Sequence, residues 1–500
     1  KKKHVQCVLQ RAAAGALSAA LILGIWQIPV QAETNSGAES KAKTEKQASG
    51  TVYYVSNEGN DENTGTSPEH AWNSLKKVNE TVFKPGDQIL FECGNIWENQ
   101  TLSPRGSGTE DAWITIGSYE GDDGIEKPQI AANAQVEDAV SLHNQEYWEI
   151  SDLDISNTAA GYVNSDTRDD ANGSKLADVR GVHISGDSGD VLSGFYMHDL
   201  KVHDVTGLVY WIGDLGGSFG ETSSQMWPGV WKETGWDDSK RTGGIVMETL
   251  EGDGKNPTTF QDVRLEDSEL IHNSFGAFTI KQWRGSQLWS DRSDDAQAPE
   301  YYDPNWKPHS GITVKNNYVD QTGIYNMNGI YVTSAENVMI EQNVVKNPGV
   351  CGIETYFVDN AVIQDNEVYG ARPKPGGSDR NGIDADRNVT NTVIQYNYVH
   401  DNGDGLLLCG FEYNTVIVRY NVIANCGRNQ ATGEYNSSYN YLRDYVGNGR
   451  IDVYNNVFWH SEDYAPNFSD HVYNGSEVWD YRNNIFYNTG SDENAKYITG

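Results

Sequence analysis

The chain has 500 residues, with 71 Asp and Glu against 37 Lys and Arg, a formal net charge of −34 and a pI near 4.6. Such acidity argues against nucleic acid and anionic membranes as partners, because both are bound through clustered Lys and Arg. It also disfavours a polyanionic substrate such as pectate, unless bound Ca²⁺ reverses the local charge.

Residues 1–32 have the pattern of a secretory signal peptide. Lys1–Lys3 precede the apolar run AAAGALSAALILGIW, and small residues around Ala32 provide a cleavage site. We therefore expect a secreted protein with no membrane insertion after cleavage. Residues 33–50 are polar and poor in apolar side chains, and are expected to form a disordered linker.

Residues 51–91 predict a capping region at the start of the folded domain. The pattern indicates a strand at 52–55, a loop rich in Gly, Asn and Asp, a short helix near 72–82 and a strand around 89–91. A helix placed here would cover the open edge of the first coil of a solenoid. Further short strands then follow from Trp113 onward, separated by turns and long insertions.

Residues 329–424 repeat one pattern four times. The copies begin at Gly329, Gly352, Gly382 and Gly405, which are 23, 30 and 23 residues apart, and such periods are typical of solenoids. Each copy holds two short apolar alternations, the signal of half-buried strands. The second strand of each copy ends in Asn, and two later coils continue the series: Asn343, Asn366, Asn397, Asn421, Asn456 and Asn484.

One Asn per coil can stack into an internal ladder of side-chain amides, a habit of right-handed parallel β-helices. We therefore predict an all-β fold, a right-handed parallel β-helix over residues 51–500 with an N-terminal capping helix and long loop insertions. The last coil would be left open at Gly500. We therefore expect the protein to continue beyond that residue, with a region that could attach it to the cell surface.

The alternation also predicts which side chains leave the core. In each first strand of the repeat, the residue after Gly and the third residue point inward, so the second and fourth point outward. Three of the outward residues are carboxylates, and we expect the chemistry on this face, which we predict to be exposed to solvent. The outward residues are Tyr331, Thr333, Glu354, Tyr356, Asp384, Asp386, Leu407 and Cys409.

The spacing of these carboxylates suits glycoside hydrolysis. Glu354 and Asp384 should lie ~5 Å apart at their backbones, and Asp384 and Asp386 roughly 6.5–7 Å apart along one strand. Retaining hydrolysis uses carboxyl groups ~5–5.5 Å apart and inverting hydrolysis ~6.5–9.5 Å, so either pairing fits. Crowding should raise one pKa, as a general acid requires. Asp379, at the end of the insertion that enters this strand, is a fourth candidate.

Other polar residues are weaker candidates for the functional site. Glu248 occupies the matching outward position of an earlier coil, with Lys281 on the coil after it, and both are candidates for substrate binding. Asp401 and Asp404 fall in a turn, where Asp usually serves the backbone. The histidines and the cysteines that follow residue 32 show no metal spacing, so we expect neither a metal site nor a disulfide framework.

Three insertions, at residues 211–241, 284–308 and 371–380, should form loops on the binding face. Their aromatic side chains could stack on sugar rings or simply pack the loops onto the coils. Tyr331 and Tyr356 flank the carboxylates and are further candidates for substrate binding. The insertion candidates are Trp227, Trp231, Trp236, Trp289 and Trp306.

Two stretches carry a family resemblance, and together they extend it over residues 51–500. The N-terminal YYVS…GNDENTGTSPEHAW…GDQILF is similar to the cap of extracellular β-helix polysaccharide-degrading enzymes, and GIDADRNVTNTVIQYNYVHDNGDGLLL resembles β-helix glycoside hydrolases. In those hydrolases, which include xylosidases, fucosidases and lacto-N-biosidases, Asp residues on one coil face act as acid/base and nucleophile. The resemblance implies Asp384 and Asp386 as the catalytic pair, Glu354 as the alternative partner and Asp379 as a further choice.

Two other functions remain open. A β-helix polysaccharide lyase would use an Asp cluster for Ca²⁺ and Lys281, Arg284 or Arg387 as the base, but the next coil offers only Asp404 before an apolar run. A non-catalytic glycan-binding or adhesin module would leave the acid cluster unexplained. We therefore predict a secreted glycoside hydrolase with a carbohydrate substrate and no required cofactor. Arg387 also remains a candidate for substrate binding.

Overall fold

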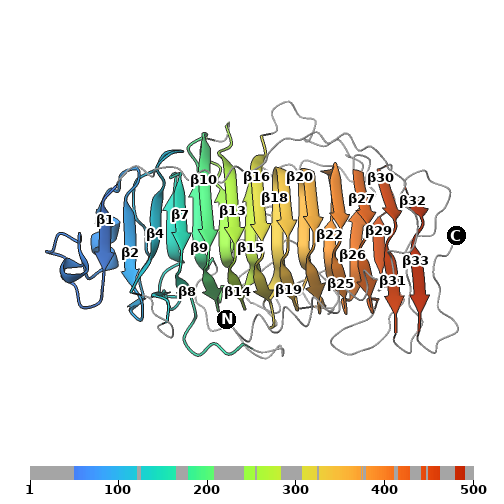
Figure 1. The fold of residues 1–500 in the computed structure, drawn as a ribbon, viewed down its shortest axis with the longest axis horizontal. Helices are drawn as coiled ribbons and strands as arrows, with labels where there is room; N and C mark the ends of the chain where they lie inside the picture. The colour runs from blue at the N-terminus through green and yellow to red at the C-terminus, as the bar shows by residue number, and fades with distance from the viewer. Residues whose placement is uncertain are drawn as a thin grey trace. The chain divides into compact units, whose positions relative to one another are not determined.

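The chain winds into successive coils of short strands, in the computed structural model shown in Figure 1. Every strand pair that the structure describes is parallel, so each coil lies directly beside the next. The described residues are 50–120, 126–164, 178–207, 241–253, 256–282, 307–323, 326–372, 374, 379–409, 415–427, 441–445, 449–461 and 479–489.

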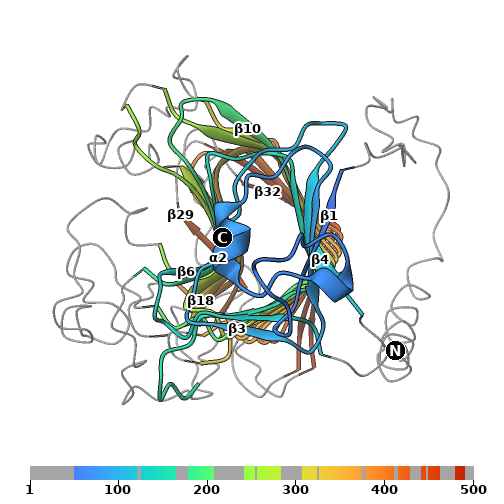
Figure 2. The same cartoon turned by 90° about the vertical axis from the view of Figure 1, so that its left-hand side faces the viewer.

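The strands form three faces around an apolar core, as the end-on view in Figure 2 shows. A 21-stranded sheet supplies two of the faces, because the long strands β18 and β20 run through both. The first face consists of β6 (Asp138–His143), β9 (Arg180–Gly186), β12 (Gly243–Thr249), β15 (Phe275–Gln282), the first halves of β18 (Asn326–Glu341) and β20 (Cys351–Gln364), β22 (Asn381–Ala385), β26 (Asp404–Cys409) and β29 (Leu442–Tyr445).

The second face starts earlier in the chain and includes the second halves of β18 and β20. Its other strands are β1 (Val52–Val55), β2 (Gln88–Glu92), β4 (Ile114–Tyr119), β7 (Trp148–Ser151), β10 (Val191–His198), β13 (Thr259–Glu266), β16 (His309–Lys315), β23 (Val389–Thr390), β24 (Thr392–Gln395), β27 (Thr415–Arg419), β30 (Arg450–Tyr454) and β32 (Trp479–Arg482).

A separate 12-stranded sheet of short strands forms the third face. It consists of β3 (Ile96–Glu98), β5 (Gln129–Ala131), β8 (Asp154–Ser156), β11 (Lys201–His203), β14 (Glu269–Ile271), β17 (Tyr318–Asp320), β19 (Val344–Lys346), β21 (Glu367–Tyr369), β25 (Tyr398–His400), β28 (Val422–Ala424), β31 (Val457–His460) and β33 (Ile485–Asn488).

The predicted cap is confirmed. A short 3₁₀ helix, η1 (Pro68–His70), precedes α2 (Leu75–Glu80), which lies across the N-terminal end of the coils in Figure 2. Ser74 caps α2 by accepting a hydrogen bond from the backbone of Lys77, and the helix buries Leu75 and Val78 against the first coil. No helix in the described parts of the chain is long and apolar enough to cross a membrane.

The core follows the alternation of the repeat. Ile330, Ile353, Ile383 and Leu406 pair in register on four neighbouring coils, and each is fully buried. Because the coils stack at the strand spacing of ~4.8 Å, these side chains form one continuous apolar column. The same register brings the outward residues of neighbouring coils side by side.

The asparagine ladder is present at the corner between the second and third faces. Asn397, for example, donates from its side chain to Oδ1 of Asn421 at 3.0 Å and to the Ile363 carbonyl at 2.9 Å, and its own Oδ1 accepts from the side chain of Asn366. The residue before it, Tyr396, has a φ of 57°, which turns the backbone sharply at the corner. The ladder thus satisfies backbone groups that the turn removes from the sheets.

We predict that Asn397→Ala destabilises the fold by about 2–4 kcal/mol, because it leaves donors and acceptors on two neighbouring coils unsatisfied inside the protein. Asn360→Ala is the matched control, since Asn360 is an exposed residue of β20 whose side chain donates to Oδ1 of Asn337 at the surface. Urea unfolding of the two variants checks the prediction, and equal losses of stability would contradict it.

Candidate active site

The outward residues of the first face stand in the predicted register. Tyr331 pairs with Glu354, Glu354 with Asp384, and Asp384 with Leu407, on β18, β20, β22 and β26. Thr333 and Tyr356 pair in the neighbouring column. The structure thus brings Glu354 and Asp384 together on adjacent strands, with the two tyrosines beside them.

The prediction that this face is open to solvent was wrong. Asp384 is 1% exposed, Glu354 and Tyr356 are 7% exposed and Tyr331 is 1% exposed. Alternation fixes the direction of a side chain relative to its own sheet, but it carries no information about what packs over that sheet. Of the four candidate carboxylates, only Asp379 and Asp386 are partly exposed.

Both buried carboxylates are held by neighbouring polar side chains. Asp384 accepts at Oδ2 from the Cys351 thiol at 3.3 Å and from the Asn381 amide at 3.3 Å. Glu354 accepts a hydrogen bond of 2.5 Å from the Asn328 side chain. The second oxygen of Asp384, Oδ1, is buried and has no hydrogen-bond partner among the residues that the structure describes. Sequence reasoning missed the three supporting residues, although each lies at or near the start of a first-face strand.

The surroundings of Asp384 disfavour the charged form of its carboxyl group. Burial raises its pKa well above the usual range, and the charges of Asp386, Glu354 and Asp379 raise it further. Burial and the same neighbourhood also raise the pKa of the Cys351 thiol, which therefore stays protonated. The four carboxylates are thus close enough to influence one ionisation, and they form what we call the acid cluster: Glu354, Asp379, Asp384 and Asp386.

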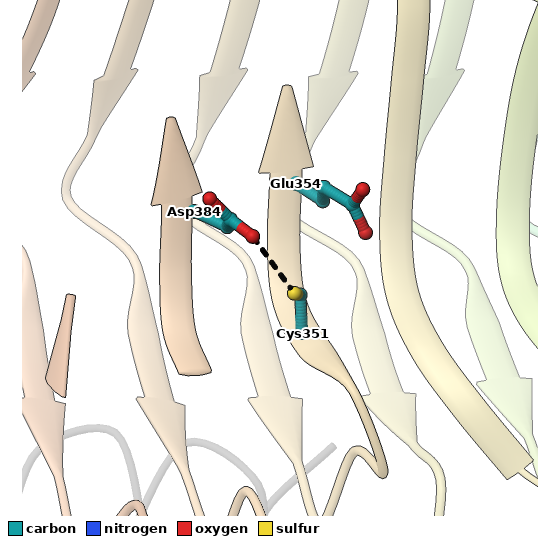
Figure 3. Close-up of side chains that lie close together, drawn as sticks. All are labelled: Cys351, Glu354 and Asp384. Atoms are coloured by element: carbon teal, nitrogen blue, oxygen red, sulfur yellow. Dashed lines mark hydrogen bonds between the residues drawn. The ribbon is translucent and has the colours of Figure 1, made fainter. Parts of the chain in front are cut away.

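Cys351, Glu354 and Asp384 place one potential ligand atom each within 4.8 Å of one another. Figure 3 shows that the Glu354 carboxylate points away from Cys351 and Asp384, which are joined by their hydrogen bond. The trio thus consists of a hydrogen-bonded pair, Cys351 and Asp384, with Glu354 held separately by Asn328.

A second charged cluster lies on earlier coils of the same face. Glu248 on β12 is 2% exposed, and its carboxylate lies 3.3 Å from Lys281 Nζ, 3.0 Å from His183 Nε2 and 3.1 Å from an Arg241 nitrogen. Although burial alone would raise it, the charges of Lys281, His183 and Arg241 hold the pKa of Glu248 well below its usual value. Asp138 accepts from the other ring nitrogen of His183 at 3.0 Å.

This ion network joins Glu248 and Lys281, as their positions in the repeat predicted. Sequence reasoning missed its other members, although the outward position of His183 in its strand was a signal for one of them. Its acids and bases are paired with one another, so we interpret the network as a structural support of the first face rather than as a reacting centre.

Several predicted residues have other outcomes. Arg387 and Asp386 are partly buried at the end of the β22 coil, where their backbones bond to Phe357 and Thr355 on the coil before. Asp404, expected to be a turn residue, begins β26, is fully buried and forms an ion pair with Arg380 at 3.1 Å. Some predictions concern positions that lie outside the described residues. These positions are 1–49, Trp227, Trp231, Trp236, Arg284, Trp289 and Trp306, together with the side chain of Cys409.

Comparisons with known proteins agree on the fold. The family described as "Right handed beta helix region" matches residues 305–490. A solved structure, the GH136 lacto-N-biosidase from Eubacterium ramulus, aligns over 87% of this chain and 68% of its own, with a TM-score of 0.63 and 22% identity. The coils therefore form a right-handed parallel β-helix, as the repeat predicted.

Two curated proteins are similar in sequence. A lacto-N-biosidase of Bifidobacterium longum subsp. longum is 26% identical over 472 residues, which cover 83% of this chain. The chain spans only 28% of the length of that relative. The uncharacterized protein YwoF of Bacillus subtilis is 28% identical over 152 residues, which cover 30% of this chain and 29% of that protein.

We predict that Asp384→Asn makes the protein more stable than wild type at pH 8 but not at pH 4. A carboxyl whose pKa is higher in the folded protein than in the unfolded chain costs stability as the pH rises above the unfolded pKa near 4. The neutral amide avoids this loss, which we expect to reach about 1 kcal/mol or more by pH 8.

Urea unfolding at the two pH values measures the difference, with Asp190→Asn, a change at an exposed acid, as the matched control. The control should change stability by the same small amount at both pH values. A difference in stability between Asp384→Asn and wild type that does not change from pH 4 to pH 8 would contradict the raised pKa of Asp384.

Proposed function

We propose that this chain is a glycoside hydrolase of the lacto-N-biosidase type, which cleaves a disaccharide unit from an oligosaccharide. The observation that carries the proposal is the acid cluster, in which a buried acid with a raised pKa lies close to two partly exposed carboxylates. The similarity to a lacto-N-biosidase over 83% of the chain supports the choice of substrate.

Burial decides which carboxylates we assign to the reaction. A catalytic carboxylate has to touch the sugar, and Asp384 and Glu354 are almost completely shielded. We therefore propose Asp379 and Asp386 as the catalytic pair, whereas the sequence favoured Asp384 with Asp386. One of the two would protonate the glycosidic oxygen, and the other would attack the anomeric carbon or activate a water molecule.

Asp384 and Glu354 support this pair without reacting. Burial and the neighbouring carboxylates raise the pKa of Asp384, which disfavours a further negative charge beside Asp379 and Asp386. Glu354 is held by Asn328 and lies on the strand before.

The state of Lys281 disfavours the lyase alternative. A lyase needs a basic group that can accept a proton beside the uronate carboxylate. Lys281 is 3% exposed, and its ammonium lies 3.3 Å from the ionised Glu248, which keeps the proton on the nitrogen. A hydrolase uses two carboxyl groups and water, so we also propose that the reaction needs no metal ion. The signal-like residues 1–32 support a secreted protein.

We predict that Asp379→Asn and Asp386→Asn each lower kcat on a lacto-N-biose-containing oligosaccharide by at least about 10³-fold, the upper range for loss of a catalytic acid or base. Asp384→Asn and Glu354→Gln should cost about 10-fold or less, because these residues act only through their neighbours. Chromatography of the released sugars, in the presence and absence of EDTA, measures the rates.

The same assay distinguishes the alternatives. Reducing sugars formed at equal rates with and without EDTA support the metal-free hydrolase. An unsaturated product absorbing near ~235 nm would instead show β-elimination by a lyase, whose base abstracts a proton. Full activity in both Asp379→Asn and Asp386→Asn would move the catalytic centre away from the acid cluster.

A further inference from the structure

Asp379 lies outside the strands, and two buried cations lie on either side of it in the chain. Lys374 precedes it by five residues and Arg380 follows it directly, just before β22 begins at Asn381. This inference rests on the proposed role of Asp379. It concerns how a carboxylate on an insertion, rather than on a strand, reaches a defined place beside Asp386.

Lys374 is bound to earlier coils by all three of its ammonium protons. The side chain is 2% exposed, and Nζ donates to the carbonyl oxygens of Gln321 at 2.6 Å, Asn326 at 2.8 Å and Asn347 at 2.8 Å. Gln321 directly follows β17, Asn326 is the first residue of β18, and Asn347 directly follows β19. An ammonium has three donors, so this site satisfies it completely, as a buried charge requires.

The aliphatic part of the Lys374 side chain also occupies a closely fitting space. A Cβ atom added to Gly349 would lie 2.6 Å from Cδ of Lys374 and 2.9 Å from the sulfur of Met327. The absence of a side chain at Gly349 therefore makes room for the lysine stem. The backbone nearby is fixed as well, because Gly349 bonds to Met327 at 2.7 Å and Arg372 to Pro348 at 3.1 Å. The site accommodates both the length and the charge of a lysine.

Arg380 is bound to the next coil in the opposite direction. It is 6% exposed, and its Nε lies 3.1 Å from Oδ2 of the fully buried Asp404 on β26. The Arg380 carbonyl accepts from the Asp404 backbone at 3.0 Å, and a Cβ atom on Gly403 would lie 2.6 Å from Cγ of Arg380. One side of Asp379 is thus anchored to the coils before β20 and the other to the coil after β22.

We propose that Lys374 and Arg380 are positioning residues, which hold Asp379 at a fixed separation from Asp386. Both are buried and bonded to the protein, so neither is expected to touch the substrate. Asp386 is fixed by its own coil, through its backbone bond to Thr355. Asp379 lies outside the strands that the structure describes, so these anchors, rather than strand pairing, would define its place. Loss of an anchor should change the geometry of the pair, on which glycoside hydrolysis depends.

The central test is Lys374→Met, which keeps the stem and removes the ammonium. We expect kcat on a fluorogenic aryl lacto-N-bioside to fall about 10- to 100-fold, with a smaller change in KM, because the carboxylate is displaced while the sugar-binding surface is kept. Lys346→Met is the matched control, since Lys346 forms a partly exposed ion pair with Asp320 on the neighbouring third face and should leave kcat unchanged.

A second background separates positioning from a general structural role. When Asp379 is already Asn, adding Lys374→Met should not lower the remaining activity further, because the group that the lysine positions has lost its function. A loss by the same factor in both backgrounds would overturn the proposal. The proposal would also be overturned if Lys374→Met had an unchanged kcat and its thermal melting curve showed that the variant is folded.

Gly349→Ala keeps the test informative if Lys374→Met does not fold. It retains the ammonium but crowds the stem, and it should lower kcat in the wild-type background and not in the Asp379→Asn background. Equal effects in the two backgrounds would contradict positioning. Full activity of the single variant Asp379→Asn would show that the proposed catalytic pair is wrong. This result is obtained without any Lys374 variant, so it is distinct from a failure of the positioning proposal.

Discussion

The parallel stacking of coils at hydrogen-bonding distance is the constraint on which the rest of the structure depends. Residues that share a register position on neighbouring coils become neighbours about 4.8 Å apart, whatever their chemistry. For apolar residues such as Ile353 and Ile383 this produces the core. For Glu354 and Asp384, one position further along, the same register forces two acids together. The pairing of Glu354 with Asp384 is therefore a direct product of the fold, and its charge has to be relieved by other means.

The parts of the molecule that depend on period were predictable from sequence. Alternation placed Ile330 in the core and Glu354 on the outer face, and the recurring Asn343 to Asn484 predicted the ladder at one corner. The capping helix was predictable because its pattern differs from that of the coils. These features share a cause, since each is set by a few neighbouring residues and then repeated.

The parts that depend on contacts between non-repeating segments were not predictable. Asp138 meets His183 across 45 residues, and Lys374 reaches the Gln321 carbonyl across 53, with no periodic signal in either pair. The burial of Asp384 was missed for the same reason, because the alternation describes one sheet and not what covers it. The interpretation of Asp404 as a turn residue overlooked Arg380, which no spacing rule connects to it.

The two charged clusters on the first face show how neighbouring coils decide the state of a buried acid. Glu248 has Lys281 on the next strand and His183 and Arg241 beside it, so it is fully ionised and saturated. Asp384 has Glu354 on the strand before and Leu407 on the strand after, and its pKa is raised by burial and by the neighbouring carboxylates. Both acids are equally buried, and only the residues brought by the stacking differ. The proposed catalytic pair, Asp379 and Asp386, belongs to the second of these clusters, so the stacking of the coils also determines the electrostatic surroundings in which the pair would act.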